Sequence, residues 1–311
     1  RDAEWRTRVL EQFEEAVRSM VQICKENGVP LALVNLGSNV RDCAPYKTEH
    51  RAALSANDER RWREAFNWAT SLEKAGELEE ALKRYREAEE IDPQYALTHW
   101  RIARCLDRLK RGKQAAKYYL RAKDEDICPL RMLDRQYVFF QKLAGETKTP
   151  IVDARALLEA QSPDGIPGND WYLDHVHPTI GGHQEIGKAI AATLRETGIL
   201  TLKLEWTKEA RRKAFASHFE SLSPVYMGNG RRRLEWLETW ANRTRLLNET
   251  EPVDARGHLH AGFRYLDFGE RGKAREALRR AIELDPAAAD ELENYRARLA
   301  AQGRELTIDL K

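Results

Sequence analysis

The sequence predicts an α/β fold that is interrupted, and then followed, by helical repeats. Three observations support this prediction: a helical pattern that leads into a short apolar run near the N-terminus, a pattern of small and aromatic residues that recurs every 34 residues, and a short loop in which an aspartate precedes a histidine by three positions. With 311 residues, the chain is long enough for two or three domains.

The first predicted elements are a helix and a strand. Residues 5–27 carry apolar side chains at helical spacing, and Gly28 can end the helix in the left-handed conformation. The run 31–36, which is apolar except for Asn35, is typical of a parallel strand that is buried on both faces. A helix followed by a strand is the order found in βαβ units, so residues 1–55 are predicted to be the first part of an α/β lobe.

Next along the chain, region 56–126 contains two copies of a 34-residue unit. Residues Ala69, Leu72, Ala81, Tyr85 and Ala88 recur 34 positions later as Ala103, Leu106, Ala115, Tyr119 and Ala122. A third copy near the C-terminus consists of Gly262, Tyr265, Gly269, Ala274, Leu278, Ala281 and Pro286. This is the period of tetratricopeptide repeats. We therefore expect 56–126 to be an inserted repeat pair and 203–311 to be a helical domain with one more repeat.

Between the repeat blocks, the α/β pattern returns. Residues 130–161 are predicted to form a helix, a short strand and a short helix in that order. The stretch 162–170 is dense in turn-forming residues and leads to the loop with the aspartate and the histidine. Residues 127–202 are therefore predicted to be the second part of the α/β lobe.

That loop contains Asp174 and His177, followed by a proline. A carboxylate three residues before a histidine can accept its Nδ1 proton and leave Nε2 free as a general base for a serine hydroxyl. Asp174 and His177 are therefore candidate members of a hydrolytic triad. One alternative is a loop in which Asp174 caps the next helix and His177 packs. Another is a metal site that includes His175 and His183, but the rest of the chain offers no further ligand cluster, so no metal is expected.

At these residues the chain resembles the SGNH, or GDSL-type, serine esterases and lipases, which carry Asp-x-x-His just before the last helix of a three-layer α/β/α domain. The resemblance implies that Asp174 orients His177 and that His177 is the base. The segment from Val34 to Pro45 resembles the region after the fourth strand in tetratricopeptide-containing members. The Gly-Asp-Ser nucleophile motif of the family does not occur here in that context. The resemblance therefore implies a lobe that is incomplete at its N-terminus, with the nucleophile upstream of Arg1.

Further candidate pocket residues follow the predicted strand at 31–36. Ser38 stands where an α/β nucleophile can lie, although a turn in which Ser38 and Asn39 bond to nearby backbone fits the resemblance better. Arg41 could line the pocket or pair with its neighbour Asp42. With His175, which belongs to the loop of Asp174 and His177, the possible pocket residues are Ser38, Asn39, Arg41 and His175.

Composition limits the partners that we expect. The 52 basic and 50 acidic residues leave a net charge of +2, which gives no general electrostatic case for nucleic acid. No apolar run reaches 18 residues, so no membrane span is predicted within the chain. The four cysteines lack Cys-x-x-Cys spacing, which argues against a zinc site. Cys43 and Cys128 flank the repeat insert, and a disulfide between them remains open, as does the compartment.

Two functions are open at this point. The first is hydrolysis of an ester or acylated substrate by a Ser-His-Asp mechanism, through an acyl-enzyme intermediate and without a metal or organic cofactor. The alternative is a non-catalytic repeat scaffold in which the α/β lobe is a relic. Stacked helix pairs make grooves suited to helices or extended peptides, so the repeats predict a protein or peptide partner.

Overall fold

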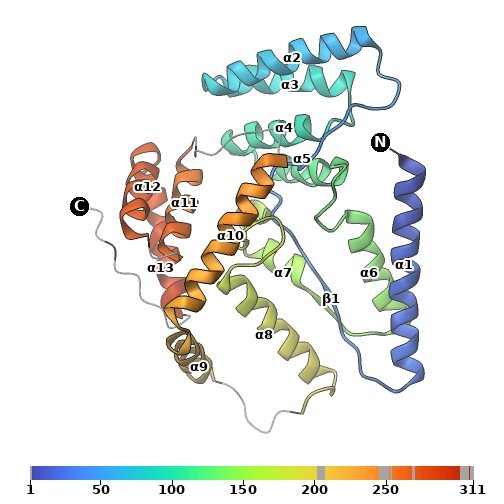
Figure 1. The fold of residues 1–311 in the computed structure, drawn as a ribbon, viewed down its shortest axis with the longest axis vertical. Coiled ribbons are helices and arrows are strands. Elements are labelled where there is room, and N and C mark those ends of the chain that lie inside the picture. The colour runs from blue at the N-terminus through green and yellow to red at the C-terminus, as the bar shows by residue number, and fades with distance from the viewer. Residues whose placement is uncertain are drawn as a thin grey trace. The chain divides into compact units, whose positions relative to one another are not determined.

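The structure is a computed structural model. The structure describes residues 2–201, 207–244, 252, 254–267, 270–301 and 308. The chain divides into two compact units, with the main division after Thr201. Figure 1 shows a predominantly helical chain in which the repeat helices lie in antiparallel pairs.

The first unit begins with α1 (Ala3–Glu26), which starts as the sequence predicts. The carboxylate of Asp2 accepts the backbone N–H of Trp5 at 2.8 Å and so caps the helix. Gly28, just after the helix, has φ +64°, the left-handed conformation that glycine adopts without strain. The inner face of α1 packs against α6 (Asp134–Thr147) in an apolar cluster. The buried members of this cluster are Val17, Val21, Leu33, Phe139, Leu143 and Ala144.

Two strands lie beside these helices. β1 (Leu33–Asn35) and β2 (Ile151–Asp153) pair in parallel, with Val34 opposite Val152. Each strand has three residues and lies within a run that the sequence predicts to be a strand. The described part of the chain adds an isolated antiparallel bridge but no third strand to this sheet.

The prediction of a three-layer α/β/α hydrolase-like lobe is therefore wrong. Such a fold needs a sheet of several strands that is covered by helices on both faces, whereas the described residues form thirteen α-helices and a two-stranded sheet. Two three-residue strands present too little surface to separate two helical layers. The short apolar runs were correctly located, but they do not belong to a larger sheet among these residues.

The repeat pair follows β1 and is wholly helical. Its first hairpin consists of α2 (Ala56–Lys74) and α3 (Leu78–Ile91), and its second of α4 (Ala96–Arg108) and α5 (Gly112–Glu125), as Figure 1 shows. The small residues of the pattern are completely buried, namely Ala69, Ala81, Ala88, Ala103 and Ala115. Because a methyl group takes little space, these alanines let the paired helices approach closely. The tetratricopeptide interpretation of this segment is thereby supported by packing as well as by period.

The rest of the first unit leads from β2 to its last helix. Asp153 caps α7 (Ala154–Ala160) by accepting the N–H of Ala156 at 2.9 Å. The short 3₁₀ helix η1 (Pro163–Gly165) and an irregular loop follow, and the unit ends with α8 (Ile180–Glu196). The loop and helices are joined by an apolar cluster of Leu158, Trp171, Tyr172 and Ile186.

The second unit contains five of the described helices. They are α9 (Lys208–Ser221), α10 (Pro224–Thr244), α11 (Ala255–Asp267), α12 (Arg271–Leu284) and α13 (Ala288–Ala301). Helices α11 and α12 form the third repeat hairpin, on which α13 packs. Gly262 is needed at this crossing, because a Cβ there would lie 2.6 Å from the side chain of Leu278. Gly269 of the repeat pattern lies outside the described residues.

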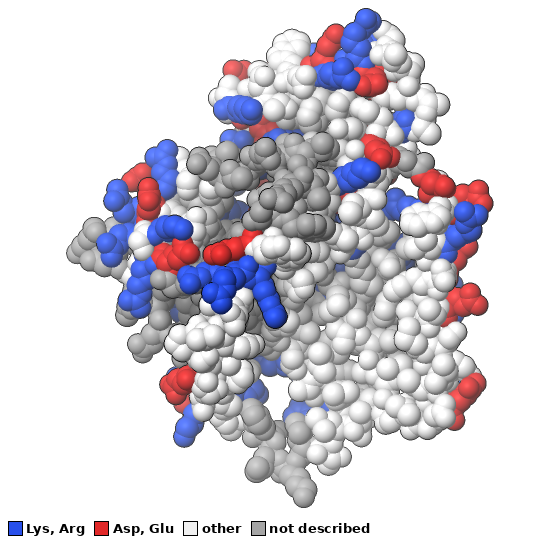
Figure 2. Space-filling model, viewed as in Figure 1, with Lys and Arg blue, Asp and Glu red and all other residues white. Residues whose placement is uncertain are grey.

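The surface carries charges of both signs. Figure 2 shows Lys and Arg side chains interspersed with Asp and Glu on the face that it draws, as the net charge of +2 leads one to expect. Within the described ranges, no helix combines the length and the apolar character that a membrane span requires. Cys43 is buried, Cys128 is half-buried, and both are free thiols.

Candidate functional site

The loop before α8 brings the predicted aspartate and histidine into contact. Oδ2 of Asp174 lies 2.6 Å from Nδ1 of His177. The other carboxylate oxygen accepts the backbone N–H groups of Val176 at 2.9 Å and of His177 at 2.8 Å. The side chain of Asp174 is 11% exposed and that of His177 is 61% exposed. The carboxylate thus closes the turn and orients the imidazole ring.

These hydrogen bonds also determine the ionisation of the carboxyl group. Burial raises the pKa of Asp174, but the backbone N–H groups of His177 and Val176, the His177 ring and the nearby His175 together lower the pKa below its ordinary value of 3.8. Asp174 is therefore a carboxylate at neutral pH. Among the described residues, His177 makes no hydrogen bond to a serine, threonine or cysteine side chain. The catalytic roles of Asp174 and His177 stay a prediction.

Asn39 and His175, two of the candidate pocket residues, lie next to each other. The backbone N–H of Asn39 donates to the carbonyl of His175 at 3.0 Å. The His175 ring contacts Tyr46 edge-on with a centroid distance of 5.2 Å, and its centroid is 6.1 Å from that of His177. The segment after β1 and the histidine loop therefore meet, although they are far apart in the sequence.

Arg41, by contrast, points to the repeats. Its guanidinium binds both carboxylate oxygens of Asp107 in α4, at 2.8 and 2.9 Å, and its side chain is 3% exposed. A weaker contact at 3.7 Å joins it to Asp164. Asp42, which the sequence offered as a partner for Arg41, instead accepts the backbone N–H of Asn169 at 2.8 Å. Arg41 is thus a link between the exit of β1 and the second repeat.

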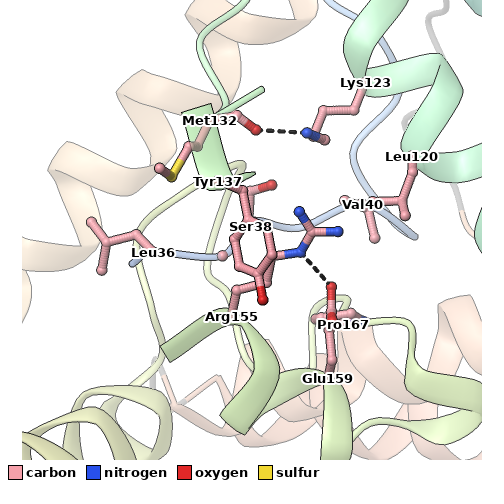
Figure 3. A pocket seen from close by; sticks show the side chains of 11 residues that line it. Leu36, Ser38, Val40, Leu120, Lys123, Met132, Tyr137, Arg155, Glu159 and Pro167 are labelled. Carbon is pink, nitrogen blue, oxygen red and sulfur yellow. Dashed lines mark hydrogen bonds and ion pairs between the residues drawn. The ribbon is translucent and has the colours of Figure 1, made fainter. Parts of the chain in front are cut away.

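Ser38 lines a different cavity, which lies where the exit of β1 approaches α5, α6 and α7 (Figure 3). The charged groups of this cavity are paired with one another or with the backbone: Lys123 donates to the carbonyl of Met132 at 2.6 Å, and Arg155 binds Glu159 at 2.7 Å. His177 is not part of the lining. The cavity therefore does not unite Ser38 with the histidine loop.

A second polar cluster, which is not among the sites predicted from the sequence, lies at the ends of α3 and α5. The irregular segment 46–51, here called the strap, crosses this region on its way from β1 to α2. Its first part is held by Asp126, which is 2% exposed. Asp126 accepts the backbone N–H of Tyr46 at 2.7 Å and that of Lys47 at 3.1 Å. The carbonyl of Lys47 in turn accepts the N–H of Ile127 at 3.1 Å.

The last part of the strap is held by Asp92 in the same manner. Asp92 is fully buried, and its Oδ2 accepts the backbone N–H of Arg51 at 3.2 Å and lies 2.7 Å from Nδ1 of His50. The His50 ring packs against two aromatic rings, Trp62 and Tyr95, each with a centroid distance of 4.6 Å, and these two rings also contact each other. The repeat thus holds this part of the strap both by a backbone hydrogen bond and by the packing of the His50 ring in an aromatic site.

Asp92 and Asp126 are equivalent positions, since they lie 34 residues apart and each directly follows the second helix of its repeat. Each also accepts, at 3.0 Å, the N–H two residues further on, from Gln94 and Cys128 respectively. The signal was present in the sequence as an aspartate at a fixed repeat position. The small and aromatic positions of the repeat form its core and predict the hairpins, whereas the contact with the strap depends on this polar position.

The repeats also enclose a carboxylate between their helices. Glu73 of α2 accepts a hydrogen bond from the Tyr85 hydroxyl at 2.8 Å and one from Arg101 at 3.2 Å. Burial and the charge of Glu73 raise the pKa of Tyr85. The same causes raise the pKa of Cys105 to about 12, so this thiol is protonated at neutral pH. The network ties α2, α3 and α4 together and does not provide a nucleophile.

Comparisons with known proteins identify the repeats. The protein-family model described as TPR repeat matches residues 73–104, and the protein-family model described as Tetratricopeptide repeat matches residues 255–287. No curated protein matches the chain. A solved structure described as YrrB, a TPR protein with an unusual peptide-binding site, matches at 16% identity over 74% of this chain and 90% of that chain, with a TM-score of 0.20. The two family matches and the helical hairpins establish that the chain contains tetratricopeptide repeats.

The prediction of an SGNH-type ester hydrolase, and of an ester or acylated substrate, is not supported by these findings. The matching family models describe repeats, and the described residues lack the sheet on which such an enzyme mounts its nucleophile. The hydrolase interpretation is therefore wrong, and the repeat scaffold that was its alternative fits better.

Proposed function

We propose that this chain is a non-catalytic tetratricopeptide scaffold that binds a protein or peptide partner in a non-helical conformation. The observation that carries the proposal is the strap, because the repeat pair already holds an irregular stretch of polypeptide by its backbone N–H groups at Asp92 and Asp126. Backbone groups are common to all peptides, so such a surface accepts a polypeptide with limited dependence on its sequence.

The repeat architecture supports this proposal. Stacked hairpins present the same groups at regular intervals, which suits a linear ligand. The contacts at Lys47 and Arg51 are four residues apart, a span of about 13 Å in an extended chain. Side-chain selection is supplied by aromatic sites such as the one around His50. A partner can therefore be bound through its backbone, with little dependence on its sequence, and also be selected by individual side chains that fit the aromatic sites.

An array of linear peptides, probed with the full chain, tests the proposal. We expect a subset of peptides to bind saturably in fluorescence polarisation. Ala81→Trp, which overpacks the crossing of α2 and α3 at a cost of about 1–3 kcal/mol, should weaken this binding. Lys83→Trp is the matched control, because Lys83 lies on the same helix with its side chain 65% exposed. It should bind as the wild type does.

A contrary result has two recognisable forms. The first is that no linear peptide binds above the level of the heat-unfolded protein. The second is that the chain turns over a small activated ester and that His177→Ala abolishes the turnover. Either result would exclude a non-catalytic scaffold of this kind.

A further inference from the structure

The third repeat carries the same terminal aspartate as the first two. Asp285 directly follows α12, and its φ of −149° and ψ of 109° resemble the φ of −133° and ψ of 91° of Asp92 after α3. Oδ1 of Asp285 accepts the N–H of Ala287 at 3.0 Å, as Oδ1 of Asp92 accepts that of Gln94 at 3.0 Å. The local turn that builds the acceptor is therefore repeated.

The second carboxylate oxygen distinguishes the two sites. In Asp92 this oxygen binds the strap, through the N–H of Arg51 and the ring of His50. Within the described ranges, Oδ2 of Asp285 has no hydrogen-bond or ion-pair partner. A carboxylate oxygen in this state can accept charge-assisted hydrogen bonds.

The apolar residue directly before the aspartate is also more exposed in the third repeat than in the first. Ile91, which precedes Asp92, is half-buried and packs with Trp62 and Ala88. Leu284, at the same position before Asp285, is 45% exposed. The third repeat thus presents both an apolar contact and an acceptor that the first repeat has covered.

The chain's own counterpart of the strap is not suited to this site. Residues 239–244 precede the third repeat at the distance at which 46–51 precede the first, and they belong to α10 (Pro224–Thr244). Helical N–H groups donate to carbonyls four residues earlier. This segment therefore does not offer the backbone donors that the strap offers.

We propose that Asp285 and the adjacent Leu284 form a docking position for an extended, basic segment of a partner polypeptide. The partner donates backbone N–H groups to Oδ2 of Asp285 and places an imidazole, lysine or arginine side chain beside the carboxylate. The chemistry is that of the strap, in which Lys47, His50 and Arg51 outnumber its one acidic residue, Glu49. The proposal rests on the proposed scaffold function, because it assigns to the third repeat the type of ligand inferred for the chain as a whole.

The probe is a synthetic peptide with the sequence of residues 44–52, labelled with fluorescein and titrated with the full chain. We expect saturable binding that Asp285→Asn weakens roughly tenfold or more, since one charge-assisted acceptor is replaced by an amide donor or a neutral oxygen. The asparagine retains an oxygen for the Ala287 N–H, so the local turn is preserved. Asp290→Asn, an exposed aspartate on α13, is the matched control and should leave the affinity unchanged.

A second probe tests the backbone contact directly. The same peptide with an N-methyl group on the amide nitrogen of its Arg51 lacks that N–H and should bind less tightly to the wild type, with little further loss on Asp285→Asn. Equal affinity of wild type and Asp285→Asn would overturn the proposal, as would the absence of saturable binding. If Asp92→Asn abolishes binding while Asp285→Asn does not, the peptide has replaced the strap. The docking position is then wrong, although peptide binding by the scaffold stands.

Discussion

Asp92 and Asp126 occupy the same position in consecutive repeats, and each holds one part of the strap through backbone N–H groups. The carboxylates are buried, so their hydrogen bonds are shielded from water and their loss leaves polar groups without partners. Both aspartates thus fix the conformation of the strap, which leads from β1 into the repeat pair, once the repeats have folded.

Asp126→Ala should lower the free energy of unfolding of the first unit by about 3 kcal/mol. The change removes an acceptor for Tyr46, Lys47 and Cys128 and leaves Arg131, whose guanidinium lies 3.5 Å away, without this carboxylate. Urea denaturation measures the effect. Asp126→Asn, which keeps one carbonyl oxygen, should lose less, and a loss below about 0.5 kcal/mol for Asp126→Ala would contradict the role assigned to the strap.

The Asp174 turn predicts a dependence of stability on pH. Because the pKa of Asp174 in the folded protein is lowered below 3.8, its carboxylate stabilises the fold at pH values above that ordinary value. This contribution is lost as the pH falls through the lowered pKa. Asp174→Asn should therefore be less stable than the wild type at pH 6 to 7, and the difference should shrink below about pH 4.

Urea titrations of both proteins between pH 3 and pH 7 give this comparison. Asp290→Asn serves as the control, because its side chain is exposed and has no hydrogen-bond partner among the described residues. A constant difference between wild type and Asp174→Asn at all pH values would show that the carboxylate charge is not the cause.

Gly262→Ala and Gly272→Ala should have opposite consequences, although both glycines lie in the third repeat hairpin. A Cβ on Gly262 would lie 2.6 Å from Leu278, so the helices must separate, at a cost of about 1–3 kcal/mol. A Cβ on Gly272 meets nothing within 4 Å, and alanine is the better helix former by up to about 1 kcal/mol. Thermal unfolding followed by circular dichroism should show a lower Tm for the first variant and an equal or higher Tm for the second. Similar Tm values for both would contradict the packing of this crossing.

The features that were predictable from the sequence are local or periodic. The alanines at 34-residue spacing predicted the hairpins, and this prediction is confirmed by their burial and by the family matches. The contact of Asp174 with His177 also follows from spacing alone, because three residues suffice to close the turn. The apolar runs marked β1 and β2 correctly.

The predictions that were wrong concern features that depend on contacts between distant parts of the chain. Two short strands carry no information about how many others join them, so the extent of the sheet was overestimated. Arg41 pairs with Asp107, 66 residues away, rather than with its neighbour Asp42. A contact of this kind cannot be predicted from the residues that surround Arg41 in the sequence.

The cysteines allow a last prediction about reactivity. Cys105 is completely buried, and burial raises the pKa of its thiol to about 12, so it is both shielded and protonated at pH 8. Cys43 is also buried, whereas Cys24 and Cys128 are half-buried. Burial and the charge of Asp126 raise the pKa of Cys128 as well. With a limiting amount of iodoacetamide at pH 8, we expect Cys24 to be modified first, Cys128 more slowly, and Cys43 and Cys105 only after unfolding in urea. Peptide mapping by mass spectrometry gives the order, and early modification of Cys105 would show that the core between α4 and α5 opens in the native state.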